Sequence, residues 1–202
     1  GPAKGFPIAE AGQPSPFSRS GPGITGGIKP DVVERGGNFL LDASNLAISR
    51  NLGTDVVMAS NQLSPPIHHN SGTSFAAPRV AHQIALIEQI LRQNGIKPSA
   101  CLLRAFLANS ARWDSPINAN WLKDNLEDKR WLAVVGLGLP DGERATLCDK
   151  NTVVMYYDGY ISPDQVAFFD ILRLIKKFNQ MVNRQIYRKI VLNARKDLKN
   201  LR

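Results

Sequence analysis

The chain has 202 residues, of which 43% are hydrophobic and 21% are charged, and its formal net charge at pH 7 is +8. This apolar content suits one core with an appendage and excludes both a disordered and a collagen-like chain. Two cysteines exclude a disulfide framework, and no apolar run reaches the roughly 20 residues that cross a bilayer. No signal peptide is visible and the first residue is not Met, so we expect a piece of a longer protein of undetermined compartment.

The positive charge is concentrated near the C-terminus. Residues 173–202 hold ten basic residues and one acidic residue, whereas residues 1–172 hold 15 basic and 16 acidic residues. The body therefore predicts no nucleic-acid surface, which would need basic side chains clustered on a folded face. Two interpretations stay open for the basic segment: a solvated helix face, or a helix that binds nucleic acid or an anionic membrane.

The first half of the chain predicts loops and short strands. Residues 1–30 hold six prolines and are expected to form loops. Residues 31–33 predict a short buried strand or an extended segment, and residues 54–60 (TDVVMAS) predict a second strand. The polar residues 61–72, which include two adjacent prolines, predict a surface loop.

Three stretches predict helices. Residues 73–94 place apolar side chains at a 3-4-3 spacing, and Gly95 is a typical C-terminal stop. A second helix is expected from residue 98 or 99 to about residue 110, with four apolar side chains turned inward, at Leu102, Leu103, Phe106 and Leu107. A third is expected over residues 165–198, with the basic charges on its outer face.

A serine stands where the second loop meets the first predicted helix. Ser74 follows Gly72 and Thr73, so it would lie in the first helical turn, where backbone N–H groups are unpaired and the helix dipole is positive. Such donors suit the oxyanion of a tetrahedral intermediate, and a glycine allows close approach of a substrate carbonyl. The same pattern also suits an ordinary serine or threonine N-cap, so spacing alone leaves both interpretations open.

Three ordered blocks resemble a known enzyme family. The segment GTSFAAPRVA at residues 72–81 is similar to the nucleophile motif of the subtilisin-like serine peptidases (subtilases), G-T-S-x-A-x-P-x-V-A. The blocks FSRSGP at residues 17–22 and IKPDVVERG at residues 28–36 resemble that family's F-S-S-R-G-P and K-P-D-V-V-A-P-G, with departures at Arg19-Ser20 and Glu34-Arg35. A further segment, VGLGLP at residues 135–140, resembles the G-x-G that closes the family's catalytic domain.

The resemblance implies a function and a site. Ser74 would be the nucleophile of a serine endopeptidase and its own N–H an oxyanion donor, with Thr73 assisting through its hydroxyl and Gly72 contacting substrate. The substrate would be a peptide or protein, with no cofactor and no metal. The alternative is a non-catalytic fragment or pseudoenzyme that binds peptides or packs against a partner.

The resemblance also implies a fold. We expect an α/β architecture of three layers around a parallel sheet, present in part because the N-terminal portion of the domain would lie upstream. Residues 1–140 would form the C-terminal portion of the catalytic domain and residues 141–202 a basic extension. The missing N-terminal half would then be a partner of this chain.

The remaining triad members are not apparent in this sequence. The family's histidine precedes the serine by a long stretch, whereas His68 and His69 immediately precede the motif and are expected at a loop or groove edge. His82 lies eight residues after Ser74, about 12 Å along a helix, too far for a direct hydrogen bond. Asp31 is expected to be structural, and Asp42 and Asp55 are expected to be solvated loop or strand-edge charges. The asparagines are not assigned to the oxyanion hole: Asn38, Asn45 and Asn51.

The cysteines and tryptophans predict structural roles. Cys101 and Cys148 have no spacing that fits a zinc site and are expected to be buried free thiols. The three tryptophans are expected to cover the edge of the core rather than form a ligand cage: Trp113, Trp121 and Trp131.

Overall fold

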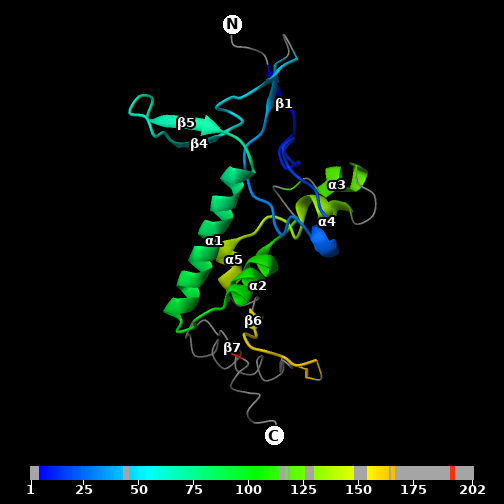
Figure 1. The fold of residues 1–202 in the computed structure, drawn as a ribbon, viewed down its shortest axis with the longest axis vertical. Coiled ribbons are helices and arrows are strands. Elements are labelled where there is room, and N and C mark those ends of the chain that lie inside the picture. Colours follow the sequence, from blue (N-terminus) through cyan, green and yellow to red (C-terminus); the bar gives the residue numbers. More distant parts are fainter. Residues whose placement is uncertain are drawn as a thin grey trace, which may run out of the picture. The chain divides into compact units, whose positions relative to one another are not determined.

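The computed structural model of the protein describes residues 5–42, 46–113, 117, 119–125, 130–147, 154–163, 165–166 and 192–193. These residues form helices and short strands, which agrees with the α/β class (Figure 1). The strands are β1 (Gly5–Pro7), β2 (Leu40–Asp42), β3 (Ile48–Ser49), β4 (Val56–Ala59), β5 (Ile67–Asn70), β6 (Met155–Tyr156) and β7 (Leu192–Asn193). The helices are the 3-10 turn η1 (Ile24–Gly26), α1 (Thr73–Gln93), α2 (Ala100–Ser110), α3 (Ala119–Asn125), α4 (Arg130–Val135) and α5 (Gly142–Thr146).

The chain divides into two compact units that interleave along the sequence. The first consists of Gly1–Gln83 and Ser110–Asp141, and the second of Ile84–Asn109 and Gly142–Arg202. These compact units do not correspond to the predicted division into residues 1–140 and 141–202. The domain boundary near residue 140 therefore stays a prediction.

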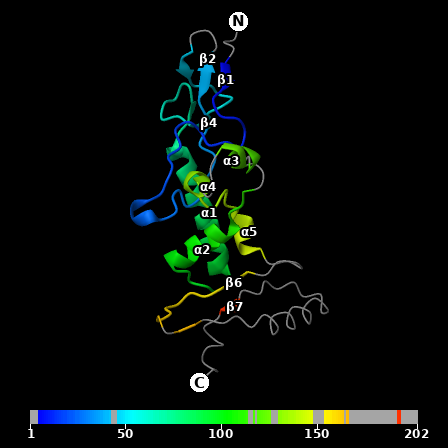
Figure 2. The ribbon, with the colours of Figure 1, turned by 90° about the vertical axis from the view of Figure 1, so that its right-hand side faces the viewer.

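The first unit holds two small antiparallel sheets. Strand β2 pairs with β1 and β3, and β1 and β2 lie side by side in Figure 2. Strands β4 and β5 form a hairpin in which His69 lies opposite Val57. Parallel pairing among the described strands occurs between β6 and β7. A three-layer parallel sheet is not formed by the described residues and remains an expectation for a larger domain.

The loop prediction for residues 61–72 is wrong in part. Strand β5 occupies Ile67–Asn70, because these residues pair with the predicted strand β4. The stretch 31–33 is not a strand, and the backbone bends at residues 31 and 32. Val33 N–H donates to the carbonyl of Gly138 (3.0 Å), and Leu137 N–H donates to that of Asp31 (2.9 Å).

Helix α1 agrees closely with its prediction. It ends before Gly95, whose φ of +78° suits glycine, and Ile96 N–H donates to the carbonyl of Leu91 (3.0 Å). This is the closing bond of a Schellman cap. Ile87 and Leu91 are almost fully buried. The helical spacing thus identifies the correct face in the second half of the helix.

Helix α2 also agrees with its prediction, and Ser99 caps it. Leu102 N–H donates to Ser99 Oγ (3.1 Å), which in turn donates to Asp158 Oδ1 (2.7 Å). Of the apolar positions predicted to face inward, Leu103 is half-buried and three are buried: Leu102, Phe106 and Leu107. The Phe106 and Tyr156 rings lie 5.7 Å apart, within the second unit.

Two further expectations need correction. Cys101 is exposed on α2, because it lies on the side of the helix away from Leu102 and Phe106, so the buried-thiol prediction is wrong. Leu192–Asn193 pair with β6 as strand β7, so a helix does not include them. The rest of the third predicted helix and Cys148 lie outside the described residues, except for two residues at the start of that helix, 165 and 166.

The tryptophan prediction agrees with the structure. Trp113 and Trp131 meet edge to face with ring centroids 3.6 Å apart, and Trp113 Nε1 donates to the carbonyl of Gly136 (3.2 Å). Trp121 is half-buried, like the other two. None of the described helices is both long and apolar enough to cross a membrane.

Candidate functional site

Ser74 lies at the surface, at the start of a long helix. Helix α1 begins at Thr73, so Ser74 is its second residue, and both side chains are exposed. The N–H groups of a first helical turn have no partners within the helix and point toward whatever occupies the helix end. Strand β5 leads through Ser71 and Gly72 into this turn (Figure 1). The predicted position of Ser74 in the first helical turn is therefore confirmed.

The turn before Ser74 is held by backbone contacts. Gly72 N–H donates to the carbonyl of Gly36 (2.7 Å), and Phe75 N–H donates to the carbonyl of Gly72 (3.1 Å). The φ of Gly72 is +153°, a conformation that residues with a Cβ rarely adopt. Residue 72 therefore favours glycine because of its backbone conformation.

Pro78 lies inside α1, four residues after Ser74. In a regular helix the N–H of residue 78 would donate to the carbonyl of Ser74, and proline has no N–H. The first turn of α1 is therefore held by one hydrogen bond fewer than a proline-free helix would have. The contact between Gly72 and Gly36 gives this turn an anchor outside the helix.

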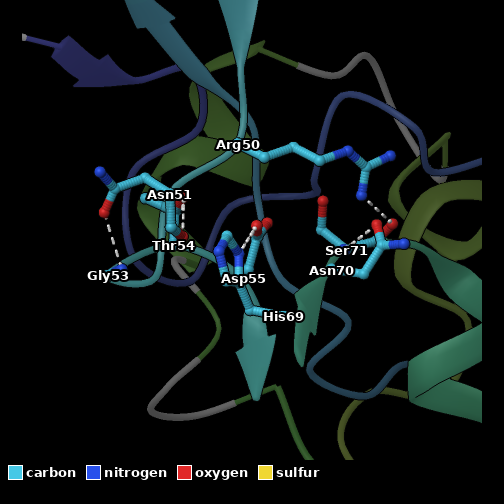
Figure 3. A network of polar contacts seen from close by, with 8 residues as sticks. All are labelled: Arg50, Asn51, Gly53, Thr54, Asp55, His69, Asn70 and Ser71. Carbon is cyan, nitrogen blue, oxygen red and sulfur yellow. Dashed lines mark hydrogen bonds and ion pairs between the residues drawn. The ribbon is translucent and has the colours of Figure 1, made fainter. Parts of the chain in front are cut away.

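A buried carboxylate and a histidine meet just before this turn (Figure 3). His69 Nδ1 lies 2.7 Å from Asp55 Oδ2. The Asp55 side chain is 0% exposed and that of His69 is 38% exposed. The expectation that Asp55 is solvated is therefore wrong, because the start of β4 turns its side chain toward β5. The loop-edge interpretation of His69 also needs correction, because His69 is a strand residue with a specific partner.

The segment before β4 is fixed by a turn built on Asn51. The side-chain oxygen of Asn51 accepts a hydrogen bond from Gly53 N–H (2.8 Å). The backbone carbonyl of Asn51 accepts hydrogen bonds from Thr54 N–H and Asp55 N–H (both 2.9 Å). Asn51 is thus occupied in a turn, which agrees with leaving it out of the oxyanion hole. Arg50 Nη1, at the start of this segment, lies 3.5 Å from the carbonyl oxygen of Ser71, as Figure 3 shows.

Of the other histidines, His68 stacks beside His69, whereas His82 lies on helix α1. His68 is exposed and its ring is 6.0 Å from that of His69. His82 is exposed on α1 and lines a surface hollow with Glu34 and Gln83, which are joined by a hydrogen bond of 2.9 Å. Within the described residues, no hydrogen bond or ion pair joins a histidine to Ser74.

The remaining polar candidates have structural partners. Asp31 is exposed and pairs with Lys29. Asp42 ends strand β2, in line with the strand-edge expectation. The Asn38 side chain donates to the carbonyl of Ala9 (2.6 Å), while Asn45 lies outside the described residues. Within the described part of the chain, no three His, Cys, Asp or Glu side chains gather in a way that could hold a metal ion.

Sequence reasoning missed the Asp55–His69 contact. The two residues are 14 positions apart, and their contact depends on the pairing of β4 with β5. The sequence signal for this hairpin is weak: VVMA reads as a strand, but IHHN holds a single apolar residue, Ile67, and so gives no strand pattern.

Comparisons with known proteins agree with the motif. Residues 7–138 match the profile of the subtilase family, Peptidase_S8. A protein of Sinorhizobium fredii, described as uncharacterised protein y4bN, is 36% identical over 172 residues, which cover 82% of this chain and 38% of that protein. The chain thus spans less than two fifths of the length of this relative. No solved structure matches. Since the family profile covers well over half of the chain, the protein belongs to the subtilase family of serine peptidases.

Proposed function

We propose that Ser74 is the nucleophile of a serine endopeptidase that cleaves peptides or proteins through an acyl-enzyme. The observation that carries this proposal is the placement of Ser74: it is exposed, it is the second residue of a 21-residue helix, and it follows a turn held by Gly72. The match of residues 7–138 to the subtilase family supports the same assignment.

The proposed reaction follows from the chemistry of serine. Ser74 Oγ attacks the carbonyl carbon of the scissile bond and passes its proton to a general base, which then protonates the leaving amine as the C–N bond breaks. The Ser74 N–H, one of the free donors of the helix end, stabilises the oxyanion, and Thr73 and Gly72 line the place where the carbonyl lies. Water then hydrolyses the ester bond to Ser74.

We propose that the base and its aspartate come from residues outside this chain. None of the three histidines contacts Ser74 within the described residues: His69 pairs with Asp55 at the end of β5, His82 lies two turns along α1, and His68 is exposed on the hairpin. In this proposal the chain is the C-terminal part of a three-layer catalytic domain, and the N-terminal part is its partner. A base is essential because a lone serine hydroxyl is a weak nucleophile at neutral pH.

A fluorophosphonate probe, which labels activated serines, tests the assignment. We expect the polypeptide from the complete gene to be labelled and its Ser74→Ala variant to remain unlabelled. Ser64→Ala is the matched control, because Ser64 is an exposed serine in the loop of the β4–β5 hairpin. Peptide mapping that places the label on another residue, or equal labelling of Ser74→Ala, would exclude Ser74 as the nucleophile.

A second candidate function is a non-catalytic module that binds peptides or a protein partner. Exposed apolar side chains on the strands favour it: Phe6, Ile48, Val57 and Ile67 are each more than half exposed. A complete polypeptide that binds peptides but is not labelled at Ser74 would support this alternative. Labelling and cleavage that both depend on Ser74 would reject it.

A further inference from the structure

The segment that carries Ser74 is contacted from one side by a single short stretch of chain. His69 and Asn70 are the last two residues of strand β5, and Ser71 and Gly72 connect this strand to α1. Residues 50–55 approach this segment at both of its ends: Asp55 at His69, and Arg50 at the carbonyl of Ser71 (Figure 3). The position of residues 69–71 is therefore coupled to that of residues 50–55.

The contact joins a carboxylate oxygen to a ring nitrogen. An ionised carboxylate can only accept hydrogen bonds, so with Asp55 ionised the shared proton lies on His69 Nδ1. The Asp55 side chain is fully buried, and its other oxygen, Oδ1, has no hydrogen-bond partner. Loss of the His69 donor would therefore leave a buried carboxylate with no side-chain partner in the described structure.

The supporting stretch is held by its own hydrogen bonds. The turn at Asn51 receives bonds from Gly53, Thr54 and Asp55, so the carboxylate is presented from a fixed backbone. A carboxylate on a mobile backbone would move together with His69, whereas one on a hydrogen-bonded turn restrains the position of His69. Held side chains of this kind keep a reacting group within the narrow range of positions that catalysis needs.

We infer that the Asp55–His69 pair is a positioning device: it holds the end of β5, and through it the turn that places Ser74. The inference rests on the proposed function of Ser74 as nucleophile. His69 acts through the backbone and needs only the donor at Nδ1, whereas a general base or a substrate contact would need Nε2. Asparagine at position 69 can place an N–H near Nδ1, whereas glutamine places its amide nearer Nε2.

Three variants in the complete polypeptide separate these roles. We expect His69→Ala and His69→Gln to slow fluorophosphonate labelling of Ser74 by about 10²-fold, the order of loss that follows a displacement of about 1 Å at a reacting group. His69→Asn should restore most of the rate. His68→Ala is the matched control, because His68 neighbours His69 on the same strand and is exposed. Thermal unfolding of each variant verifies that it is folded.

The outcomes are distinct. Labelling of His69→Asn as slow as that of His69→Gln, in a folded protein, overturns the inference and assigns a direct role to Nε2. Normal labelling of Ser74 in folded His69→Ala and His69→Gln also overturns the inference, because Ser74 would then not depend on His69.

A second readout does not depend on activity. In the 202-residue chain, ¹⁵N spectra of His69 should show the proton on Nδ1, and amide exchange at residues 71–74 should quicken in His69→Gln but not in His69→Asn. If the complete wild-type polypeptide is not labelled at all, the proposed function fails. Exchange rates at residues 71–74 that are the same in all variants overturn the positioning inference independently.

Discussion

Gly36 and Gly72 lie in direct backbone contact. Gly72 N–H donates to the carbonyl of Gly36, and a Cβ added at residue 36 would lie 2.6 Å from the carbonyl oxygen of Gly72. Real Cβ atoms do not approach a backbone oxygen so closely, and the oxygen belongs to the turn before Ser74. The block at residues 28–36 and the serine motif at residues 72–81 therefore meet through two residues without side chains.

The first prediction concerns this contact. Gly36→Ala should displace the turn, slow labelling of Ser74 by about 10²-fold and lower the free energy of unfolding by about 1–3 kcal/mol. Gly27→Ala is the control, because Gly27 has a φ of −64° and no atom within 4 Å of an added Cβ. Labelling rates and urea unfolding measure the two effects. A Gly36→Ala protein with normal labelling would show that the turn yields at little cost.

The second prediction concerns the cap of α2. Ser99→Ala removes the acceptor for Leu102 N–H and the hydroxyl donor to Asp158. We expect a loss of about 1 kcal/mol in the free energy of unfolding, as is usual for an N-cap. Ser99→Thr should keep most of the stabilisation by the N-cap, because threonine also caps helices. Urea unfolding followed by circular dichroism measures this, and equal midpoints for all three proteins would contradict the capping role.

The third prediction concerns alkaline pH. Burial, and secondly the negative charge of Asp158, raise the pKa of Tyr156 above its usual value of 10.0. Above pH 10 the unfolded chain loses this proton while the folded chain keeps it, so stability falls as pH rises toward the folded pKa. Tyr156→Phe should therefore lose less stability between neutral pH and pH 11 than the wild type.

Two observations sharpen the test of Tyr156. Its hydroxyl is buried without a hydrogen-bond partner, so Tyr156→Phe should cost little stability at pH 7. Tyr160→Phe is the control, because Tyr160 is 84% exposed. This substitution should not alter how stability changes between pH 7 and pH 11. Thermal unfolding from pH 7 to 11 gives both slopes. The same slope for Tyr156→Phe and the wild type would contradict the prediction.

The fourth prediction concerns the 202-residue chain by itself. Under the proposed function it lacks the base and aspartate, so its fluorophosphonate labelling should be no faster than that of the urea-unfolded chain. The complete polypeptide, measured under the same conditions, is the positive control. Rapid labelling of Ser74 in the isolated chain would mean that a base lies within it, and His68 or His69 would then be the first residues to test.

The sequence predicted the parts of the fold that depend on neighbours along the chain. Helices α1 and α2 carry their own signals, namely apolar spacing and the Gly95 stop, so their bounds agree with the structure within two residues. The surface position of Ser74 followed directly from the start of α1. These features need no knowledge of distant residues.

The rest depended on contacts between distant segments. Strand β5 exists because it pairs with β4, and the burial of Asp55 follows from that pairing. Cys101 was misjudged because the apolar spacing of α2 does not show where its packed face ends. The contact between Gly36 and Gly72 joins two motifs whose proximity no local pattern encodes.

Pro78 has a consequence for the order in which α1 forms. Proline disfavours helical backbone at the residue before it and cannot donate to the carbonyl of Ser74, so helix growth toward the N-terminus slows at residue 77. The buried Ile87 and Leu91 and the Gly95 cap favour nucleation in the other half. We expect φ-values near zero at residues 74–77 and higher values at residues 87–91. The turn that carries Ser74 would then be among the last to settle during folding, so a chain can be largely helical before it can be labelled.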